Sequence, residues 1–250
     1  MTMFTLIRLP TLQIDDKSVE ADIILFDLDG TLVDDRDRYS HLASIRLRTV
    51  REVAGKEASL TWARLSGVNP ETLEVDMNGP LSKAPRREDQ AIAAAALYQH
   101  GHPYHRAREL AQKIYDEADK AQADSYTPRL FSGAAEALIR LRDVGFRLGM
   151  ATNGETRITA QVLKALEIDG LFDVVVGADM VVEGKPAPDM ILEACEMLGV
   201  EPSQAIYVGD QPTDAQAGRS ARVAMIIGVG DPELTSSGAD VVLQSVAELR

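Results

Sequence analysis

The hydrophobic pattern changes character twice along the chain. Ala21–Phe26 is a short apolar run that ends in an acidic, glycine-containing turn, as is typical of a buried parallel strand whose carboxyl end carries function. From about Asp35 to Thr127 the chain is rich in Ala, Arg, Glu and Leu, with helical periodicity and few β-branched runs. The helices predicted there are Tyr39–Val53, Arg86–Gln99 and Arg106–Ala123.

Beyond Pro128, helical and strand patterns alternate. Strands that alternate with short helices predict right-handed crossovers and a doubly wound parallel sheet. The helices predicted are Ala134–Val144, Thr156–Glu167 and Pro188–Leu198, and the strands are Phe146–Ala151, Val174–Gly177, Ala205–Val208, Arg222–Ile227 and Val241–Leu243.

The early strand must join this later sheet, because an isolated strand has no stable partner. We therefore predict an α/β fold with a doubly wound parallel sheet: a Rossmann-like catalytic core of residues 1–34 and 128–250, and an all-helical cap domain inserted as residues 35–127. Residues 1–20 have no clear pattern, and a β-ribbon, an arm and a partly ordered tail all remain open for them.

The composition limits the kinds of partner that this protein is expected to bind. A net charge of -13 argues against an extended nucleic-acid surface, whereas an excess of carboxylates suits a protein that recruits a divalent cation. The sequence holds no apolar stretch of membrane-spanning length. Its one cysteine, Cys195, excludes an intramolecular disulfide and favours a reducing compartment. We expect a cytoplasmic protein without a membrane or nucleic-acid partner; oligomeric state has no signature here.

Acidic and polar side chains follow the carboxyl ends of several predicted strands, where doubly wound sheets bind ligands. Like charges packed that closely repel one another unless a cation lies among them. Hard oxygen ligands without nearby Cys or His favour Mg²⁺, which also accepts phosphate oxygens. The residues that should meet there are Asp27, Asp29, Thr152, Asn153, Lys185, Asp210 and Asp214.

Phosphoryl transfer needs an in-line nucleophile, a proton for the leaving oxygen and positive charge against the phosphoryl oxygens. Asp27 is the first residue after its strand and is positioned to attack. Asp29, two residues further on, is positioned to protonate the leaving alkoxide and then to deprotonate the hydrolytic water.

Five other residues complete the predicted site. Thr152, Asn153 and Lys185 supply hydrogen-bond donors and a charge to the phosphoryl oxygens. Asp210 is expected to hold the metal. Asp214 is expected either to bind a metal water or to fix Lys185.

These motifs, in this order, resemble the haloacid dehalogenase superfamily of phosphohydrolases, in the subgroup that carries a helical cap between the first and second motifs. Phosphoglycolate phosphatases and β-phosphoglucomutases belong to that subgroup. The matches are DLDGT at Asp27–Thr31, ATNG at Ala151–Gly154, GKPAPD at Gly184–Asp189 and GDQPTD at Gly209–Asp214.

The resemblance implies that Asp27 is the nucleophile and Asp29 the acid and base. By the same match Thr152 and Lys185 hold phosphate, while Asp27, the Asp29 carbonyl and Asp210 bind Mg²⁺. The function implied is Mg²⁺-dependent hydrolysis of a small phosphorylated metabolite, as in phosphoglycolate-phosphatase-like members.

Two alternatives stay open. Mutases of the β-phosphoglucomutase type resemble this chain, but they usually carry a histidine twelve residues beyond the nucleophile, where Tyr39 stands and His41 is offset by two. Dehalogenases and phosphonatases lack an acid at the position of Asp29, which argues against both. The alternative of another class is a non-catalytic binding module that retains the fold.

Substrate specificity would come from the cap, where Tyr39, His41 and Arg46 are candidates by location only. Trp62 is expected in the core of the cap rather than at a ligand. The basic pair Arg86-Arg87 and the loop histidines His100, His102 and His105 are expected on solvated faces, with contact to an anionic substrate left open for the basic pair.

Overall fold

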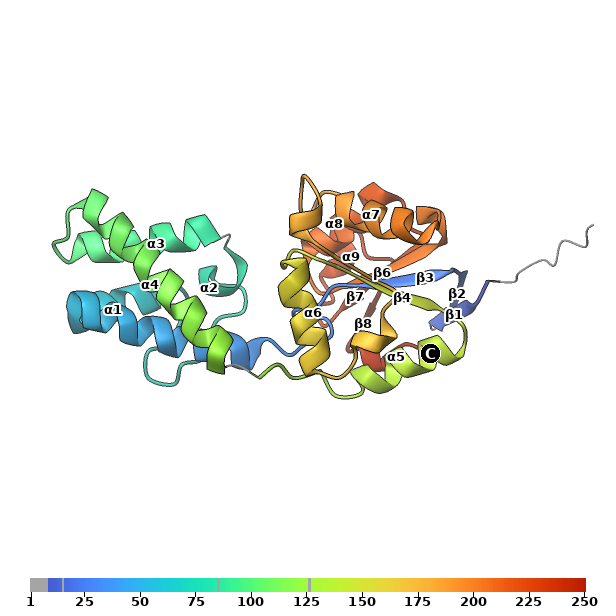
Figure 1. Ribbon diagram of the computed structural model, residues 1–250, viewed down its shortest axis with the longest axis horizontal. Coiled ribbons are helices and arrows are strands. Elements are labelled where there is room, and N and C mark those ends of the chain that lie inside the picture. Colours follow the sequence, from blue (N-terminus) through green and yellow to red (C-terminus); the bar gives the residue numbers. More distant parts are fainter. Residues whose placement is uncertain (1–8, 15, 85, 126) are drawn as a thin grey trace, which may run out of the picture. The chain divides into compact units, whose positions relative to one another are not determined.

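The computed structural model describes residues 9–14, 16–84, 86–125 and 127–250. The chain divides into two compact units, Met1–Asp34 with Pro128–Arg250, called here the core unit, and Asp35–Thr127, called the helical unit (Figure 1). Each unit has a hydrophobic core of its own. Among the described residues, no helix combines the length and the apolar character needed to cross a membrane.

The core unit is built on a six-stranded sheet in the order β5-β4-β3-β6-β7-β8, and every neighbouring pair is parallel. The predicted parallel sheet is therefore confirmed. β3 lies inside the sheet, and the strands that follow it along the chain go first to one side and then to the other. Such a reversal opens a ligand crevice at the carboxyl ends. The strands are β3 (Ile23–Phe26), β4 (Arg147–Thr152), β5 (Val174–Gly177), β6 (Ala205–Gly209), β7 (Met225–Val229) and β8 (Val241–Leu243).

Helices cover both faces of this sheet, because alternate strand residues point to opposite sides. In β3, Ile24 and Phe26 join the cluster that contains Leu138 of α5, whereas Ile23 and Leu25 join the cluster that contains residues of α7 and α8 (Figure 1). The helices are α5 (Ala134–Asp143), α6 (Thr156–Ala165), α7 (Asp189–Leu198), α8 (Pro212–Ala221) and α9 (Leu234–Ser237), with short 3-10 turns η1 (Asp169–Leu171), η2 (Ala178–Met180), η3 (Pro202–Gln204) and η4 (Val246–Glu248).

One predicted strand begins too early. The prediction placed a strand at Arg222–Ile227, but β7 starts at Met225. Arg222 instead ends α8 in the left-handed conformation, at φ 60°, and its amide closes the last helical turn. A residue that caps a helix in this way cannot at the same time extend in a strand.

The amino-terminal segment contains a two-stranded antiparallel ribbon, β1 (Thr11–Ile14) and β2 (Lys17–Glu20). Of the three possibilities for residues 1–20, the β-ribbon is thus confirmed for the residues of these strands, while residues 1–8 lie outside the described part. Leu12 and Ile14 alternate with exposed neighbours and are buried in the main core. The ribbon therefore packs as part of the core unit.

The helical unit comprises α1 (Arg36–Leu65), α2 (Pro80–Lys83), α3 (Arg86–Gln99) and α4 (Tyr104–Ser125). The predicted end of the first helical segment at Val53 falls just before Gly55, where two helices meet across a kink, whereas the second segment, up to Leu65, was not predicted. Gly55 takes a non-helical conformation at φ 85°, but helix resumes beyond it. It resumes because Ala58 and Trp62 continue to bury apolar surface. Trp62 lies in the core of the unit, as predicted.

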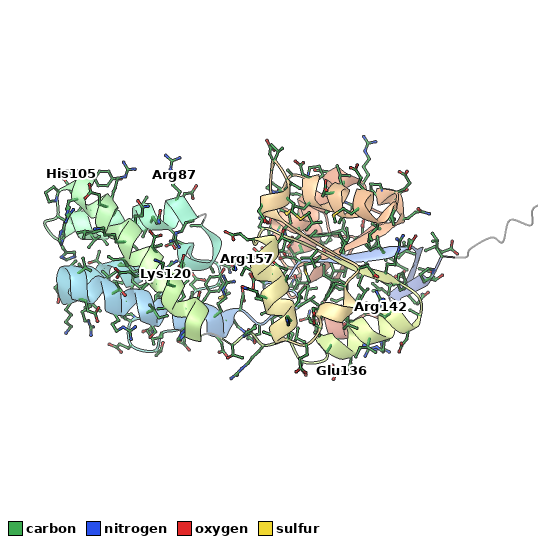
Figure 2. The ribbon with its side chains drawn as sticks, viewed as in Figure 1. Arg87, His105, Lys120, Glu136, Arg142 and Arg157 are labelled. Atoms are coloured by element: carbon green, nitrogen blue, oxygen red, sulfur yellow. The ribbon has the colours of Figure 1, made fainter. Side chains whose placement is uncertain are left out.

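Charged residues on the outside of this unit behave as solvated groups. Arg87 on α3 and His105 on α4 are exposed and point away from the unit's core (Figure 2). This bears out their assignment to solvated faces.

A buried ion pair joins α1 to α3 inside the helical unit. The Arg46 guanidinium lies 2.5 Å from the Asp89 carboxylate, and both side chains are 5% exposed. Arg46 also stacks on the ring of Tyr115, with 3.8 Å between the guanidinium carbon and the ring centroid. The Tyr115 hydroxyl donates to Asp89 at 2.8 Å. Burial raises the pKa of Asp89, while the charge of Arg46 opposes that rise.

Removing the acid of this pair should destabilise the protein strongly. In Asp89→Ala, the buried Arg46 guanidinium loses its buried counter-charge and keeps only the longer contact with the half-exposed Asp119, and the free energy of unfolding should fall by about 3 kcal/mol. Urea unfolding followed by helical circular dichroism measures the change. The matched control is Glu109→Ala, which breaks a pair with Arg106 whose side chains are 58% and 54% exposed and should cost under about 1 kcal/mol. Equal losses in the two variants would contradict this account.

Candidate active site

The acidic residues of two adjacent strands meet at one edge of the sheet. β3 pairs with β6 so that Phe26 lies opposite Val208, and the backbone amide of Asp27 donates to the Val208 carbonyl at 2.9 Å. Asp210 follows β6 directly. Carboxylate oxygens of Asp27, Asp210 and Asp214 consequently lie within 4.8 Å of one another. Strand register thus brings Asp27 and Asp210 together, and the first turn of α8 adds Asp214.

A buried lysine neutralises part of this acidic cluster. The Lys185 ammonium lies 2.7 Å from Asp27 Oδ1 and 2.6 Å from Asp214 Oδ1, and its side chain is 3% exposed. Burial by itself lowers the pKa of Lys185, but the negative charges around it, first that of Asp27, outweigh burial and raise the pKa well above its ordinary value. The lysine therefore stays charged beside Asp27.

One ammonium cannot balance three carboxylates. Burial, together with the charges of Asp27 and Asp214, raises the pKa of Asp210 to about 7. A cation among the carboxylates would offset the repulsion between their negative charges, and carboxylate oxygens are ligands of hard divalent ions. The donor set therefore fits a metal ion held by Asp27, Asp210 and Asp214.

The turn after β3 is shaped around Asp210. The hydroxyl of Thr31 donates to Asp210 Oδ1 at 3.0 Å, and the side-chain amide of Gln211 donates to the other carboxylate oxygen of Asp210. Gly30 has a left-handed φ of +82°, and a Cβ there would overlap the Asp210 carboxylate. Only glycine fits both the conformation and the space.

The end of β4 brings Thr152 and Asn153 to the same edge. Thr152 is buried, and its hydroxyl accepts a hydrogen bond from the Gly154 amide at 3.3 Å. The side-chain oxygen of Asn153 accepts from the Lys185 amide at 2.9 Å, and its nitrogen donates to the Lys185 carbonyl at 3.4 Å. Asn153 thereby holds the backbone of the loop that carries Lys185, called here the lysine loop. A donor role of Asn153 toward phosphate stays a prediction.

Four other predicted site residues are not members of this group of three carboxylates. Asp29 is half-buried and stands outside the group of three carboxylates. Tyr39, His41 and Arg46 all belong to α1 of the helical unit. Tyr39 donates to the Ser82 carbonyl at 3.3 Å, His41 is half-buried, and Arg46 is occupied by its buried pair with Asp89.

One residue at this edge escaped the sequence analysis. The hydroxyl of Tyr207 accepts from the Lys185 ammonium at 3.1 Å. Within the predicted strand Ala205–Val208, Tyr207 counted only as one more apolar position. The available signal was its polar tip, since a tyrosine in a fully buried strand needs a hydrogen-bond partner.

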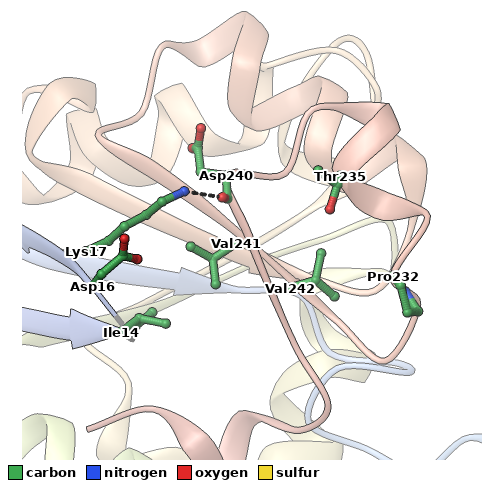
Figure 3. A pocket seen from close by; sticks show the side chains of 8 residues that line it. All are labelled: Ile14, Asp16, Lys17, Pro232, Thr235, Asp240, Val241 and Val242. Atoms are coloured by element: carbon green, nitrogen blue, oxygen red, sulfur yellow. Dashed lines mark hydrogen bonds between the residues drawn. The ribbon is translucent and has the colours of Figure 1, made fainter.

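A hollow of about 300 Å³ lies in another part of the core unit, where the β1–β2 ribbon approaches β8 (Figure 3). The Lys17 ammonium donates to the Asp240 carbonyl there at 2.6 Å. Its lining has no residue in common with the acidic cluster, and we assign it no part in the site. The lining residues are Ile14, Asp16, Lys17, Pro232, Thr235, Asp240, Val241 and Val242.

Comparison with known proteins shows the family to which this chain belongs. A family model described as haloacid dehalogenase-like hydrolase matches residues 21–222. The chain belongs to the haloacid dehalogenase-like hydrolases. Among curated members, phosphoglycolate phosphatase of Escherichia coli (strain K12) is 32% identical over 235 residues, covering 90% of each chain. Phosphoglycolate phosphatase of Salmonella typhimurium is 31% identical over 235 residues with the same coverage.

Solved structures of haloacid dehalogenase-like proteins share the fold. A HAD-superfamily hydrolase from Geobacter sulfurreducens aligns with a TM-score of 0.62 at 24% identity, over 91% of this chain and 94% of that one. β-Phosphoglucomutase from Clostridium difficile aligns with a TM-score of 0.60 at 20% identity, over 92% and 93%. At these identities the likeness shows the fold alone, and it confirms the predicted fold class.

Gly30→Ala should damage the acidic cluster of this hydrolase. The left-handed backbone and the overlap with Asp210 should together lower the free energy of unfolding by about 1–3 kcal/mol, and turnover should fall as Asp210 is displaced. Gly170→Ala is the matched control, because nothing lies within 4 Å of a Cβ there, and it should change stability by less than about 0.5 kcal/mol. Urea unfolding and activity assays compare the two variants. An unchanged Gly30→Ala enzyme would disprove this account of the turn.

Proposed function

We propose that this hydrolase is a Mg²⁺-dependent phosphatase that cleaves a small phosphomonoester through an aspartyl-phosphate on Asp27. The observation that carries the proposal is the buried Asp27 carboxylate, 2.7 Å from the Lys185 ammonium and grouped with Asp210 and Asp214. Relatives named phosphoglycolate phosphatase, at 31–32% identity, support a substrate of the size and charge of a small phosphorylated metabolite.

Three carboxylates are the proposed holders of Mg²⁺: Asp27, Asp210 and Asp214, with the backbone carbonyl of Asp29 added by resemblance to the family. When bound, the ion supplies positive charge against the phosphoryl oxygens. The excess of negative charge over the single Lys185 ammonium is what makes a cation necessary here.

The chain's own residues carry the two displacements. A carboxylate oxygen of Asp27 attacks phosphorus, and the bond from phosphorus to the leaving alkoxide breaks as Asp29 gives that oxygen a proton. Asp29 then takes a proton from water, whose oxygen attacks the same phosphorus. Phosphate leaves, and the Asp27 carboxylate is restored. Lys185 and Thr152 stabilise the charge on the phosphoryl oxygens throughout.

Asp27→Asn tests the nucleophile. Wild-type protein with Mg²⁺ should release phosphate from p-nitrophenyl phosphate and from a panel that includes 2-phosphoglycolate, and EDTA should stop the reaction. Asp27→Asn should lose at least about a thousandfold in kcat, because an amide does not form the acyl phosphate. Asp169→Asn, an exposed change in the same unit, should keep wild-type turnover.

Three results would argue for another function. Full turnover in Asp27→Asn would remove the nucleophile from its role. Wild-type protein that turns over nothing in the panel would favour a binding module that retains the fold. Interconversion of sugar-phosphate isomers with little free phosphate would favour a mutase.

Asp29→Asn tests the acid and base separately. Loss of the proton donor should lower kcat by about 10²–10⁴-fold. Mg²⁺ affinity, measured by isothermal titration calorimetry, should stay within about threefold of wild type, because the contact expected at this position is made by the backbone. A variant that loses Mg²⁺ affinity while retaining turnover would overturn the assignment.

A further inference from the structure

The side chain of Tyr207 contacts the charged residues at the edge of the sheet. It belongs to β6, has a relative exposure of 0% and packs in the cluster between the sheet and α7 and α8. A phenylalanine would fill the same space. The hydroxyl is therefore the part of this residue that packing does not explain, because a buried hydroxyl costs free energy unless it is hydrogen-bonded.

That hydroxyl joins three separate segments. It donates to the Ala151 carbonyl at 2.8 Å, directly before Thr152 at the end of β4. It lies 3.2 Å from Asp214 Oδ1 in the first turn of α8, and it accepts from the Lys185 ammonium at 3.1 Å. A hydroxyl has one proton. The shorter contact assigns that proton to Ala151, which leaves the oxygen lone pairs for Lys185.

The three N–H groups of the Lys185 ammonium correspond to three acceptors. These are Asp27 Oδ1 at 2.7 Å, Asp214 Oδ1 at 2.6 Å and the Tyr207 oxygen at 3.1 Å. The two carboxylates attract the ammonium into the acidic cluster, whereas Tyr207 provides an uncharged acceptor for the third N–H group. A lysine side chain has four flexible carbons, so three acceptors are needed to fix the direction of each N–H group.

We infer that Tyr207 is a positioning residue of the proposed phosphatase: its hydroxyl orients the Lys185 ammonium between Asp27 and Asp214, so that the lysine charge is in place when phosphoryl transfer occurs. The inference rests on the proposed function. It requires no contact between Tyr207 and substrate. Its effect passes entirely through Lys185.

Tyr207→Phe removes the hydroxyl and keeps the ring. One ammonium N–H then lacks its acceptor, and the lysine loses its fixed direction. We expect kcat to fall about tenfold with KM within about twofold, as when an interaction made mainly in the transition state is weakened. The inhibition constant of orthovanadate, which takes the five-coordinate geometry of phosphoryl transfer, should rise by a similar factor.

The vanadate constant separates positioning from a structural role. A variant that is merely less stable contains fewer active molecules, and this lowers apparent kcat but leaves the inhibition constant unchanged. Ile191→Val provides the control, because Ile191 is buried in the same cluster and should lower Tm without changing vanadate inhibition. Should Tyr207→Phe not fold, Tyr207→Met fills a similar volume without a hydroxyl and should raise the vanadate constant likewise.

The possible outcomes distinguish a failure of the Tyr207 inference from a failure of the proposed function. If folded wild-type protein hydrolyses no phosphomonoester in the panel, the proposed function fails and the Tyr207 inference fails with it. If the wild type is active and Tyr207→Phe keeps both kcat and the vanadate constant within about twofold, only the positioning role is overturned. A fall in kcat with an unchanged vanadate constant also overturns it.

Discussion

The Lys185 ammonium lies within 2.7 Å of both the Asp27 and the Asp214 carboxylates, and the three side chains have almost no exposure to water. Taking these charges out of water is costly, and the attraction between them, several kcal/mol for each pair at an effective dielectric constant of about 20, offsets that cost only while the geometry holds. Any movement of the lysine loop or of α8 would leave a buried charge unpaired. The surrounding structure is arranged to prevent such movement.

The parallel sheet provides that arrangement. β3, β4 and β6 lie side by side in the centre of the sheet, and their apolar residues are buried on both faces. Their carboxyl ends are therefore fixed relative to one another to within the precision of side-chain packing. Asn153 extends this rigidity to the lysine loop by bonding to its backbone. The reactive side chains lie on loops, but each loop begins at a strand that packing holds rigid.

Periodicity and turn chemistry predicted much of this structure. β5 at Val174–Gly177, β8 at Val241–Leu243 and α3 at Arg86–Gln99 have the predicted bounds, because Gly and Pro punctuation agrees with tertiary packing there. Gly55 interrupts the helix where the prediction ended it, but the helical segment beyond it, up to Leu65, was not predicted, because packing decides whether a helix resumes after a glycine. The meeting of Asp27 and Asp210 was predictable because parallel register places the ends of neighbouring strands together.

Two features of the site were beyond the reach of the sequence. A hydrophobic pattern counts Tyr207 as apolar because of its ring. The partner of its hydroxyl depends on the position of a lysine that belongs to a loop distant in the sequence. In the same way, the hydrogen bonds from Asn153 to Lys185 depend on the path of the chain between β5 and α7. Patterns along one segment indicate what that segment buries; they do not indicate which polar atoms from other segments will meet it.

Two buried ion-pair clusters, one in each unit, stand out among the residues that the structure describes, and they differ in charge balance in a way that bears on function. In the helical unit, the buried Arg46 pairs with the buried Asp89 and lies 3.4 Å from the half-exposed Asp119, and Tyr115 donates to Asp89. The two buried charges, one positive and one negative, balance each other. In the core unit, one ammonium stands against three carboxylates, and burial, reinforced by the charges of Asp27 and Asp214, raises the pKa of Asp210. A folded chain keeps an unbalanced buried cluster only at a cost in stability, and a bound cation is the simplest agent that removes the cost. The unbalanced site is therefore the one that needs a ligand, and the balanced one serves the fold.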